Sequence, residues 1–365
     1  MPANTPSPPS AASPHPPGDG PAPGQERLEP TGERDGVAIV EVTSGPIVES
    51  RHRVRMVIAD PGGQVLDHWG DVDHRIYPRS AIKPIQALPI VETGAADAFG
   101  LSNAELALAC GSHTGEPVHV DAVTAWLQRI GCGVGDLECG AQTPNDGEAA
   151  HALRTRGEAP SALHNNCSGK HAGFLTTARH RNEPTAGYTA FTHPVQQRLL
   201  GVLEQMTAQD LHGAPWAADG CSIPTIAVPL GGLAMAMARM ATLTHVPDQR
   251  AAAIDRVRRA WGGEPYMVAG RDRFDTALMT ATGGRVLVKQ GAEGVACACL
   301  PDQGLGIALK VEDGTKRAAH VAMGSLLHGL GAIGDQAWAI VAGFTMPQIR
   351  TRRGVAVGTI RLAGR

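Results

Sequence analysis

The stretch RVLVKQGAEGVACACLPDQGLGIALKVED, residues 285–313, decides the fold that we expect for this chain. It contains three runs rich in valine, leucine and isoleucine, and GAEG and PDQG separate them. Aliphatic and β-branched runs bounded by glycine, proline and aspartate are typical of strands joined by short turns. The stretch therefore predicts three consecutive antiparallel strands.

A second group of strands precedes a long helical region. VAIVEV (37–42) is β-branched, and RVRMVIAD (53–60) alternates before PGG turns the chain into QVLDHWG (64–70). The last two runs predict a β-hairpin. The strands of this group are expected within residues 37–70.

The region between the two groups of strands, residues 80–282, has the three-and-four spacing of apolar residues that predicts helices. Strands segregated from helices favour one mixed, mostly antiparallel sheet with a helical layer or subdomain, an α/β fold of the α+β kind. We expect one catalytic domain over 36–365. The clearest predicted helices, including one that follows the last strands, are 80–94, 102–110, 117–131, 193–206, 247–261 and 315–330.

The first 35 residues differ in composition from the rest of the chain. They hold ten of the 27 prolines, and their first large aliphatic residue is Leu28. Such a stretch buries too little apolar surface to offset the entropy lost on ordering, so we predict a disordered leader over 1–35. It lacks the basic start and the apolar core of a secretory signal.

Charge and cysteine usage exclude several classes of protein. The formal net charge is -3 and no basic stripe is present, which gives no electrostatic case for binding nucleic acid. No window approaches the run of about 18 apolar residues that a membrane span needs. Seven cysteines without an export signal argue against a disulfide framework and favour the cytoplasm.

Ser80 and Lys83 stand three positions apart in RSAIKPIQ (79–86), and this spacing predicts a catalytic pair. Only five of the 32 lysine and arginine residues are lysines. Arginine keeps its proton in proteins, whereas burial or a neighbouring cation makes a lysine easier to deprotonate. Residues three apart share a helix face, so the amine can reach the hydroxyl. The alternative is a solvated lysine one turn after a serine that caps the helix.

Two further blocks carry groups that suit the same chemistry. CGSHTGEP (110–117) is a glycine-flanked loop that we expect to expose Ser112, His113 and Thr114. Lys289 ends a predicted strand in a Lys-x-Gly sequence, and a second cation there would favour the neutral form of the base. The order Ser-x-x-Lys, serine loop and strand Lys-x-Gly resembles that of serine β-lactamases and penicillin-binding proteins. The alternatives are an ordinary turn serine and a strand-end lysine.

Sulfur and nitrogen groups gather in NNCSGKHAGFL (165–175) and DGCSIP (219–224). Ligand chemistry alone favours Cys167, His171 and Cys221, because thiolates and imidazoles suit zinc. A lysine in the same block must first lose its proton before it can bind a metal. The alternative is a pair of buried cysteines that act as small hydrophobic side chains.

Five blocks of this sequence resemble those of the rhizobial-type L-asparaginases, also called class 3 or thermolabile asparaginases. In chain order the blocks are RSAIKPIQ, CGSHTGEP, NNCSGKHAGFL, DGCSIP and KQGAEG, and the resemblance covers about residues 37–330. It implies hydrolysis of L-asparagine to L-aspartate and ammonia. It also implies a homodimer and a fold related to glutaminases and serine β-lactamases.

The resemblance implies roles for ten residues. They are Ser80, Lys83, Ser112 and Lys289 for catalysis, Arg79, His171 and Asp219 for binding substrate, and Cys167, Lys170 and Cys221 for binding zinc. In the family the catalytic groups form two tandems, which here are Ser80 with Lys83 and Ser112 with Lys289. We expect the zinc to hold the charged end of the substrate or a water molecule rather than to make the nucleophile.

Two other functions remain open from the sequence. A different Ser-x-x-Lys hydrolase, such as a β-lactamase, an esterase or a glutaminase, would use the same pair on another substrate. A non-catalytic protein on the same fold would bind an amino acid and release no ammonia, although the presence of both serines and both lysines argues against it.

Overall fold

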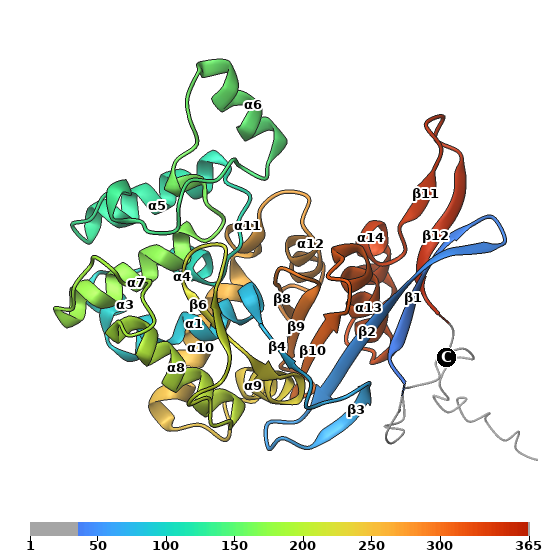
Figure 1. The fold of residues 1–365 in the computed structure, drawn as a ribbon, viewed down its shortest axis with the longest axis horizontal. Helices are drawn as coiled ribbons and strands as arrows, with labels where there is room; N and C mark the ends of the chain where they lie inside the picture. The colour runs from blue at the N-terminus through green and yellow to red at the C-terminus, as the bar shows by residue number, and fades with distance from the viewer. Residues whose placement is uncertain (1–35, 364–365) are drawn as a thin grey trace, which may run out of the picture.

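A computed structural model describes residues 36–363 of the chain. The predicted disordered leader, residues 1–35, lies outside the described residues. A helical body is joined to an antiparallel sheet whose longest strands extend away from it (Figure 1). The predicted fold class, a mixed α/β fold with a mostly antiparallel sheet from both groups of strands, is confirmed.

The main sheet has eight strands in the order β11-β12-β1-β2-β10-β9-β8, and β3 pairs with the C-terminal half of β2. Its neighbouring strands are antiparallel. The two predicted groups of strands meet where β2 pairs with β10, from Val54 opposite Val311 to Ala59 opposite Gly306. The strands are β1 (Ala38–Ser44), β2 (Ile47–Ala59), β3 (Val65–Trp69), β4 (Arg75–Ile76), β5 (Trp216–Ala218), β6 (Pro224–Ile226), β7 (Val228–Pro229), β8 (Leu287–Gln290), β9 (Val295–Leu300), β10 (Leu305–Val311), β11 (Gln348–Arg350) and β12 (Ala356–Leu362).

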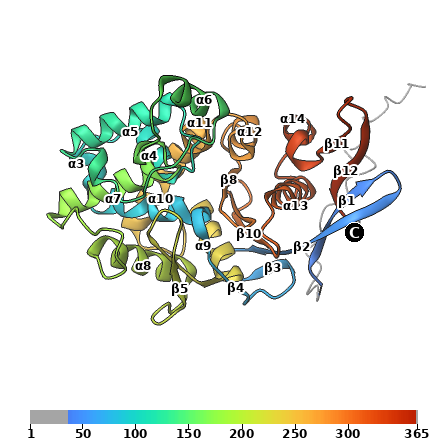
Figure 2. The same cartoon turned by 45° about the horizontal axis from the view of Figure 1, so that its top comes forward.

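Helices cover both faces of the sheet. Helix α9 packs on β2, β9 and β10 from the side of the helical body, and α13 and α14 lie on the opposite side (Figure 1, Figure 2). The short 3-10 helices are η1 (Arg79–Ile82), η2 (Val134–Asp136) and η3 (Ala162–His164). The α-helices are α1 (Lys83–Gln86), α2 (Leu88–Glu92), α3 (Ala95–Ala98), α4 (Asn103–Cys110), α5 (Pro117–Arg129), α6 (Gly147–Arg156), α7 (Ser168–Arg181), α8 (Pro194–Thr207), α9 (Leu230–Thr242), α10 (Asp248–Gly263), α11 (Pro265–Ala269), α12 (Phe274–Ala281), α13 (Lys316–Gly329) and α14 (Asp335–Thr345).

The helix predicted over 80–94 is broken into three short pieces, η1, α1 and α2. Pro84 and Pro89 each lie in the first turn of a new helix, where the missing N–H is tolerated. In contrast, Ser102 and Glu105 form a capping box that starts α4 at its expected position. Prolines therefore turn one long helix into a bent path, and Ser80 lies on its first segment.

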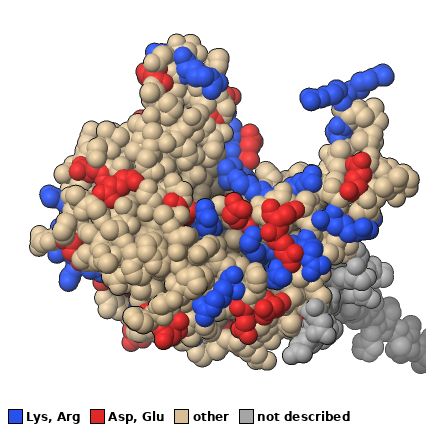
Figure 3. All heavy atoms as spheres, in the orientation of Figure 1, with Lys and Arg blue, Asp and Glu red and all other residues tan. Residues whose placement is uncertain are grey.

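The surface shows mixed charges on the face drawn in Figure 3. Basic and acidic groups are interspersed around the middle of this face, while much of the helical body carries few charged groups. Within residues 36–363, no helix is both long and apolar enough to cross a membrane.

Candidate active site

The segment that carries Ser80 lies against the end of β8. Gly291 follows β8, and a Cβ added to it would lie 3.0 Å from Pro78 O and 3.1 Å from Ala81 N. Both atoms belong to the main chain around Ser80, so a side chain at residue 291 would push the two segments apart by a few tenths of an ångström. The Lys-x-Gly sequence thus places Lys289 beside the Ser-x-x-Lys segment.

The amine of Lys83 is fully buried, with 0 % of the residue exposed. Its Nζ donates to the carbonyl oxygen of Gly111, lies 3.0 Å from Ser112 Oγ and 3.3 Å from Asn166 O. No carboxylate within residues 36–363 forms an ion pair with it. All three neighbours of Nζ can accept hydrogen bonds, so they satisfy the three N–H groups of an ammonium, whereas a neutral amine would use its lone pair to accept the proton of Ser112.

Burial makes both lysines of the site easier to deprotonate. It lowers the pKa of Lys83 below its ordinary value, Lys170 lowers it further, and charge on Cys167 opposes the change. It also lowers the pKa of Lys289 to about 7, although Asp275 opposes this change. A lysine with such a pKa can exchange a proton near neutral pH, which an arginine cannot.

The serine and lysine partners differ from the predicted tandems. Lys83 is hydrogen-bonded to Ser112, whereas Ser80 Oγ has no hydrogen-bond partner within residues 36–363. Lys289 Nζ donates to a main-chain carbonyl at 2.6 Å and lies 3.8 Å from Asp275 Oδ2. Lys83 is close enough to Lys289 to lower the pKa of Lys289. The four predicted residues therefore lie in one region of the fold. The hydrogen bond between a serine and a lysine in this region joins Lys83 to Ser112.

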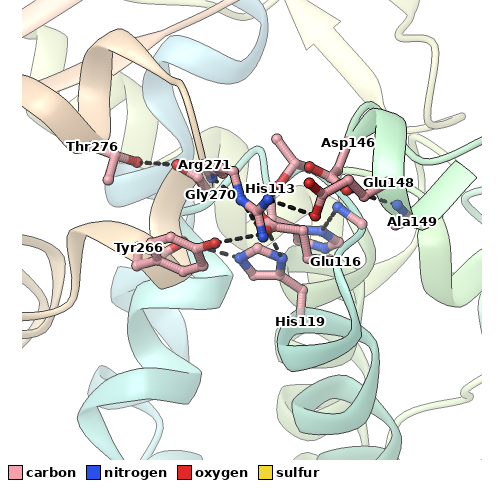
Figure 4. A network of polar contacts seen from close by, with 12 residues as sticks. His113, Glu116, His119, Asp146, Glu148, Ala149, Tyr266, Gly270, Arg271 and Thr276 are labelled. Atoms are coloured by element: carbon pink, nitrogen blue, oxygen red, sulfur yellow. Dashed lines mark hydrogen bonds and ion pairs between the residues drawn. The ribbon is translucent and has the colours of Figure 1, made fainter.

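The loop that carries Ser112 is held by the buried carboxylate of Glu116 (Figure 4). This carboxylate accepts hydrogen bonds from Thr114 Oγ1 at 2.5 Å, from the Arg271 N–H at 3.1 Å and from the Tyr266 hydroxyl. These donors come from the loop itself, from α11 and from the segment between α11 and α12. Glu116 therefore fixes the loop to a neighbouring part of the fold.

Two of the three residues that we expected the loop to expose are buried. His113 Nε2 lies 2.9 Å from Ser168 Oγ, and the His113 ring stacks on His119 with 4.9 Å between ring centres. Thr114 faces inward, while Ser112 remains partly exposed. The prediction of exposure is wrong for His113 and Thr114, because each side chain has a polar partner inside the protein.

Arg79 and Asp219 form an ion pair at the site, with 2.8 Å between Nη2 and Oδ1. It joins η1 to the turn between β5 and β6. Arg79 (φ 54°) and Ser222 (φ 74°), which lies in that turn, both have left-handed backbone conformations. Residues other than glycine adopt this conformation at a cost of about 1–3 kcal/mol, and such residues cluster at functional sites. Within residues 36–363, the buried Nε of Arg79 has no hydrogen-bond partner, so one donor stays available.

His171 is buried, and its ring is oriented by Tyr188. The Tyr188 oxygen accepts the main-chain N–H of Glu138 at 2.8 Å and lies 2.7 Å from His171 Nδ1. The phenol proton is thus free to bond Nδ1, which places the ring proton of a neutral histidine on Nε2. This Nε2 is buried and has no partner within the described residues, so it is a donor without an acceptor.

Cys167, Lys170 and Cys221 lie together, and Lys170 Nζ is 3.1 Å from Cys221 Sγ. A hydrogen bond from Cys221 lowers the pKa of Cys167 well below its ordinary value. Burial alone would lower the pKa of Lys170, but the negative charge on Cys167 and the hydrogen bond to Cys221 raise it. Two sulfurs and an amine fit the ligand preference of zinc once the amine has lost its proton. Within residues 36–363, no three His, Cys, Asp or Glu side chains form such a set.

Three residues of the site were not predicted from the sequence. Glu116 belongs to the CGSHTGEP block, so its position in that block was a usable signal. Tyr188 is one of only three tyrosines in the chain, and its scarcity was a weak signal. Asp275 carries no signal in the sequence, because only the fold brings it to Lys289.

The chain matches a model of one protein family and has similarity to solved structures. The crystal structure of Mglu in its native form has 14% identity and a TM-score of 0.44, covering 77% of this chain and 64% of Mglu. A β-lactamase from Mycobacterium bovis has 13% identity and a TM-score of 0.38, covering 80% of this chain and 95% of that protein. This chain thus spans about 64% of the length of Mglu.

Both TM-scores are low, so the description of the fold rests on the sheet order and the helices given above. A search of the curated proteins found no match. The family model described as L-asparaginase II matches residues 40–362, which is nearly the whole described part of the chain. The chain therefore belongs to the L-asparaginase II family.

Proposed function

We propose that this protein hydrolyses L-asparagine to L-aspartate and ammonia, with Ser80 as the nucleophile and Lys83 as its base. The observation that carries the proposal is the buried Lys83 amine, which has no ion-paired carboxylate within residues 36–363 and lies 3.0 Å from the hydroxyl of Ser112, the residue that we propose as the proton relay. Burial favours the neutral amine, and a neutral amine takes a proton from a serine. Membership of the L-asparaginase II family supports amide hydrolysis.

The reaction uses the hydroxyls and amines in sequence. Ser80 Oγ attacks the side-chain amide carbon of asparagine, and the Ser80 proton moves to Lys83 Nζ. The C–N bond then breaks, and the proton passes through the Ser112 hydroxyl to the nitrogen that leaves as ammonia. Water then attacks the carbonyl carbon of the aspartyl ester and gives a proton to Lys83 Nζ through the Ser112 hydroxyl. The bond between this carbon and Ser80 Oγ breaks, and Lys83 returns the proton to Ser80 as aspartate leaves. Lys289 stabilises the oxyanion, and one donor of this kind contributes about 10²–10³ in rate.

Charged residues around the serines suit the two ends of the asparagine zwitterion. Arg79 would bind the α-carboxylate, and Asp219 would bind the α-ammonium group, so the substrate would replace their mutual ion pair. The unpartnered Nε2 of His171 would donate to an oxygen of the substrate. A simple amide without both charges would lose these contacts, which favours an amino acid as substrate.

Zinc is a further part of the proposal. Cys167, Lys170 and Cys221 would hold the ion, and bound zinc would supply a positive charge for the charged end of the substrate or for a water molecule. Lys170 would give up its proton on binding, so uptake of the metal becomes stronger as the pH rises. The homodimer remains a prediction that the family resemblance implies, and the cytoplasmic location remains a prediction from cysteine usage.

A coupled ammonia assay on L-asparagine and L-glutamine, together with a chromogenic β-lactam, tests the function. We expect ammonia from asparagine in the wild type, loss of essentially all of it in Ser80→Ala, and an intact fold in that variant. Ser50→Ala on β2 removes a hydroxyl away from the site and serves as the matched control. Hydrolysis of the β-lactam without release of ammonia would identify the rival hydrolase, and binding of asparagine without turnover would identify a binding protein.

The two serines are distinguished by trapping the acyl-enzyme. Mass spectrometry of acid-quenched protein should find an aspartyl adduct in wild type and in Ser112→Ala, which loses the proton relay but keeps the nucleophile. The adduct should be absent from Ser80→Ala. An adduct in Ser80→Ala that is absent from Ser112→Ala would assign the nucleophile to Ser112 instead.

A further inference from the structure

Asp275 is a buried carboxylate beside Lys289, and the reaction above gives it no role. The residue is 2 % exposed and lies in the first turn of α12. Its Oδ2 lies 3.8 Å from Lys289 Nζ and accepts the main-chain N–H of Gln290 at 3.2 Å. Within residues 36–363, its Oδ1 has no hydrogen-bond partner.

This pair is the only one within residues 36–363 in which a lysine forms an ion pair with a carboxylate. The other contact of the Lys289 amine is the carbonyl oxygen of Gln290 at 2.6 Å. Asp275 therefore contacts both the side chain and the main chain at the end of β8. The end of β8 lies against the main chain around Ser80. The Asp275 carboxylate therefore helps to set where the Lys289 amine lies relative to Ser80.

Charged and titratable groups from several elements surround the pair. Lys289 is surrounded by Asp275 and Arg273 at the start of α12, Lys83 of α1, Cys167 at the start of α7, Cys110 of α4 and Cys297 of β9. Asp275 also interacts with Lys316 and His320 of α13. Asp275 is the carboxylate among these groups, and it offsets the positive charges of Arg273, Lys83 and Lys316.

We propose that Asp275 is a positioning residue for the hydrolysis, and that its carboxylate holds the Lys289 ammonium group in place beside the Ser80 segment. The inference rests on the proposed function. A buried ammonium group without a counter-ion loses its proton more readily, and an uncharged amine stabilises an oxyanion less. Asp275 thus keeps Lys289 charged and in place when the oxyanion forms.

The charge on Lys289 responds to Asp275 in a known direction. Burial lowers the pKa of Lys289 to about 7, and Asp275 is the largest influence that opposes the decrease. Asp275→Asn keeps the shape and the acceptor for the Gln290 N–H but removes the charge. We therefore expect the neutral amine to dominate at a lower pH in this variant, which moves the alkaline limb of the activity profile to lower pH.

The experiment uses the full chain labelled with ¹³C-lysine, because five lysines give five signals that Lys→Arg variants assign. We expect the Lys289 signal to titrate near pH 7 in wild type. In Asp275→Asn the midpoint of the Lys289 titration should move to lower pH by at least about one unit. The pH at which kcat is half lost on the alkaline side should decrease by the same amount. An unchanged midpoint, or an unchanged limb in an active enzyme, would overturn the proposal.

Three controls keep the result interpretable. Asp272→Asn removes an exposed charge three residues away and should leave both midpoints unchanged. In wild-type protein labelled with ¹³C-aspartate, the Asp275 signal should shift at the same pH as Lys289, which needs no variant that might misfold. If wild type releases no ammonia, the proposed function fails. The lysine and aspartate titrations would still show whether Asp275 controls the charge on Lys289.

Discussion

Substitution of Gly169 tests how closely α7 lies on α4, the contact that brings the two halves of the site together. A Cβ at this position would lie 2.6 Å from Leu108 O and 2.8 Å from Leu108 Cβ. To reach even 3.0 Å, α7 has to move away from α4 by about 0.4 Å. The start of α7 carries Lys170, and α4 leads into the loop with Ser112, so the displacement acts on the site directly.

The expected change in the free energy of unfolding on Gly169→Ala combines two opposing effects. Alanine favours a helix over glycine by up to about 1 kcal/mol. Forcing extra atoms into a well-packed contact costs about 1–3 kcal/mol. We therefore expect Gly169→Ala to lose up to about 2 kcal/mol of stability. A misplacement of about 1 Å can cost about 10²-fold in rate, so a smaller displacement should reduce kcat/KM about 10-fold.

Urea denaturation followed by circular dichroism, and ammonia release at fixed pH, measure the two effects. Gly201→Ala in α8 is the matched control, because no atom lies within 4 Å of its added Cβ. The control has the same gain in helix propensity without the collision, so it should raise stability by up to about 1 kcal/mol and keep the activity. If Gly169→Ala were stabilised as much as Gly201→Ala, the close contact between α7 and α4 would be refuted.

The remaining predictions concern the base, the substrate donor, the pH dependence of stability and the metal. Lys83→Arg keeps a cation but removes the base, so ammonia release should fall by about 10²–10⁴-fold, as in Lys83→Met; a near-normal rate would show that Lys83 is not a base. Tyr188→Phe removes the proton that orients His171, so steady-state kinetics should show KM for asparagine rising more than kcat falls. The pKa of Lys289 is about 7 in the folded protein against an ordinary 10.5, so the unfolded chain binds more protons between these values. Stability should therefore rise with pH across that window, by up to about 1.4 kcal/mol per pH unit, and urea midpoints should lose this rise in Lys289→Met. Elemental analysis should find zinc in the wild type after dialysis and much less in Cys167→Ser.

The strands and several helices were predictable because each has a local pattern. The three runs over 285–313 appear as β8, β9 and β10, and the hairpin over 53–70 appears as β2 and β3. The start of α4 is also set locally, because the capping box of Ser102 and Glu105 needs only these two residues. In contrast, the sequence predicted no strand after 313, where β11 has only three residues and β12 buries only Ile360.

The partners within the site were less predictable, since they depend on how the helices pack. Lys83 and Ser80 are close in sequence, but the bent path of η1 and α1 and the position of α4 bring Lys83 to Ser112. The counter-ion of Lys289 comes from α12, fourteen residues earlier in the chain, and no local spacing predicts that contact. Composition therefore identified the reactive groups, while tertiary packing determined which of them meet.

The pairing of β2 with β10 has a consequence for synthesis of the chain. Strand β2 cannot pair with β10 until Val311, the partner of Val54, has been synthesised. At about 5–20 residues per second a ribosome needs more than about ten seconds to make the residues between them. During that time one edge of the N-terminal hairpin has no partner strand, which invites pairing with other nascent chains. Lys289 is synthesised only shortly before β10. The chain therefore obtains its last proposed catalytic residue at almost the same time as β10 covers the unpaired edge of β2.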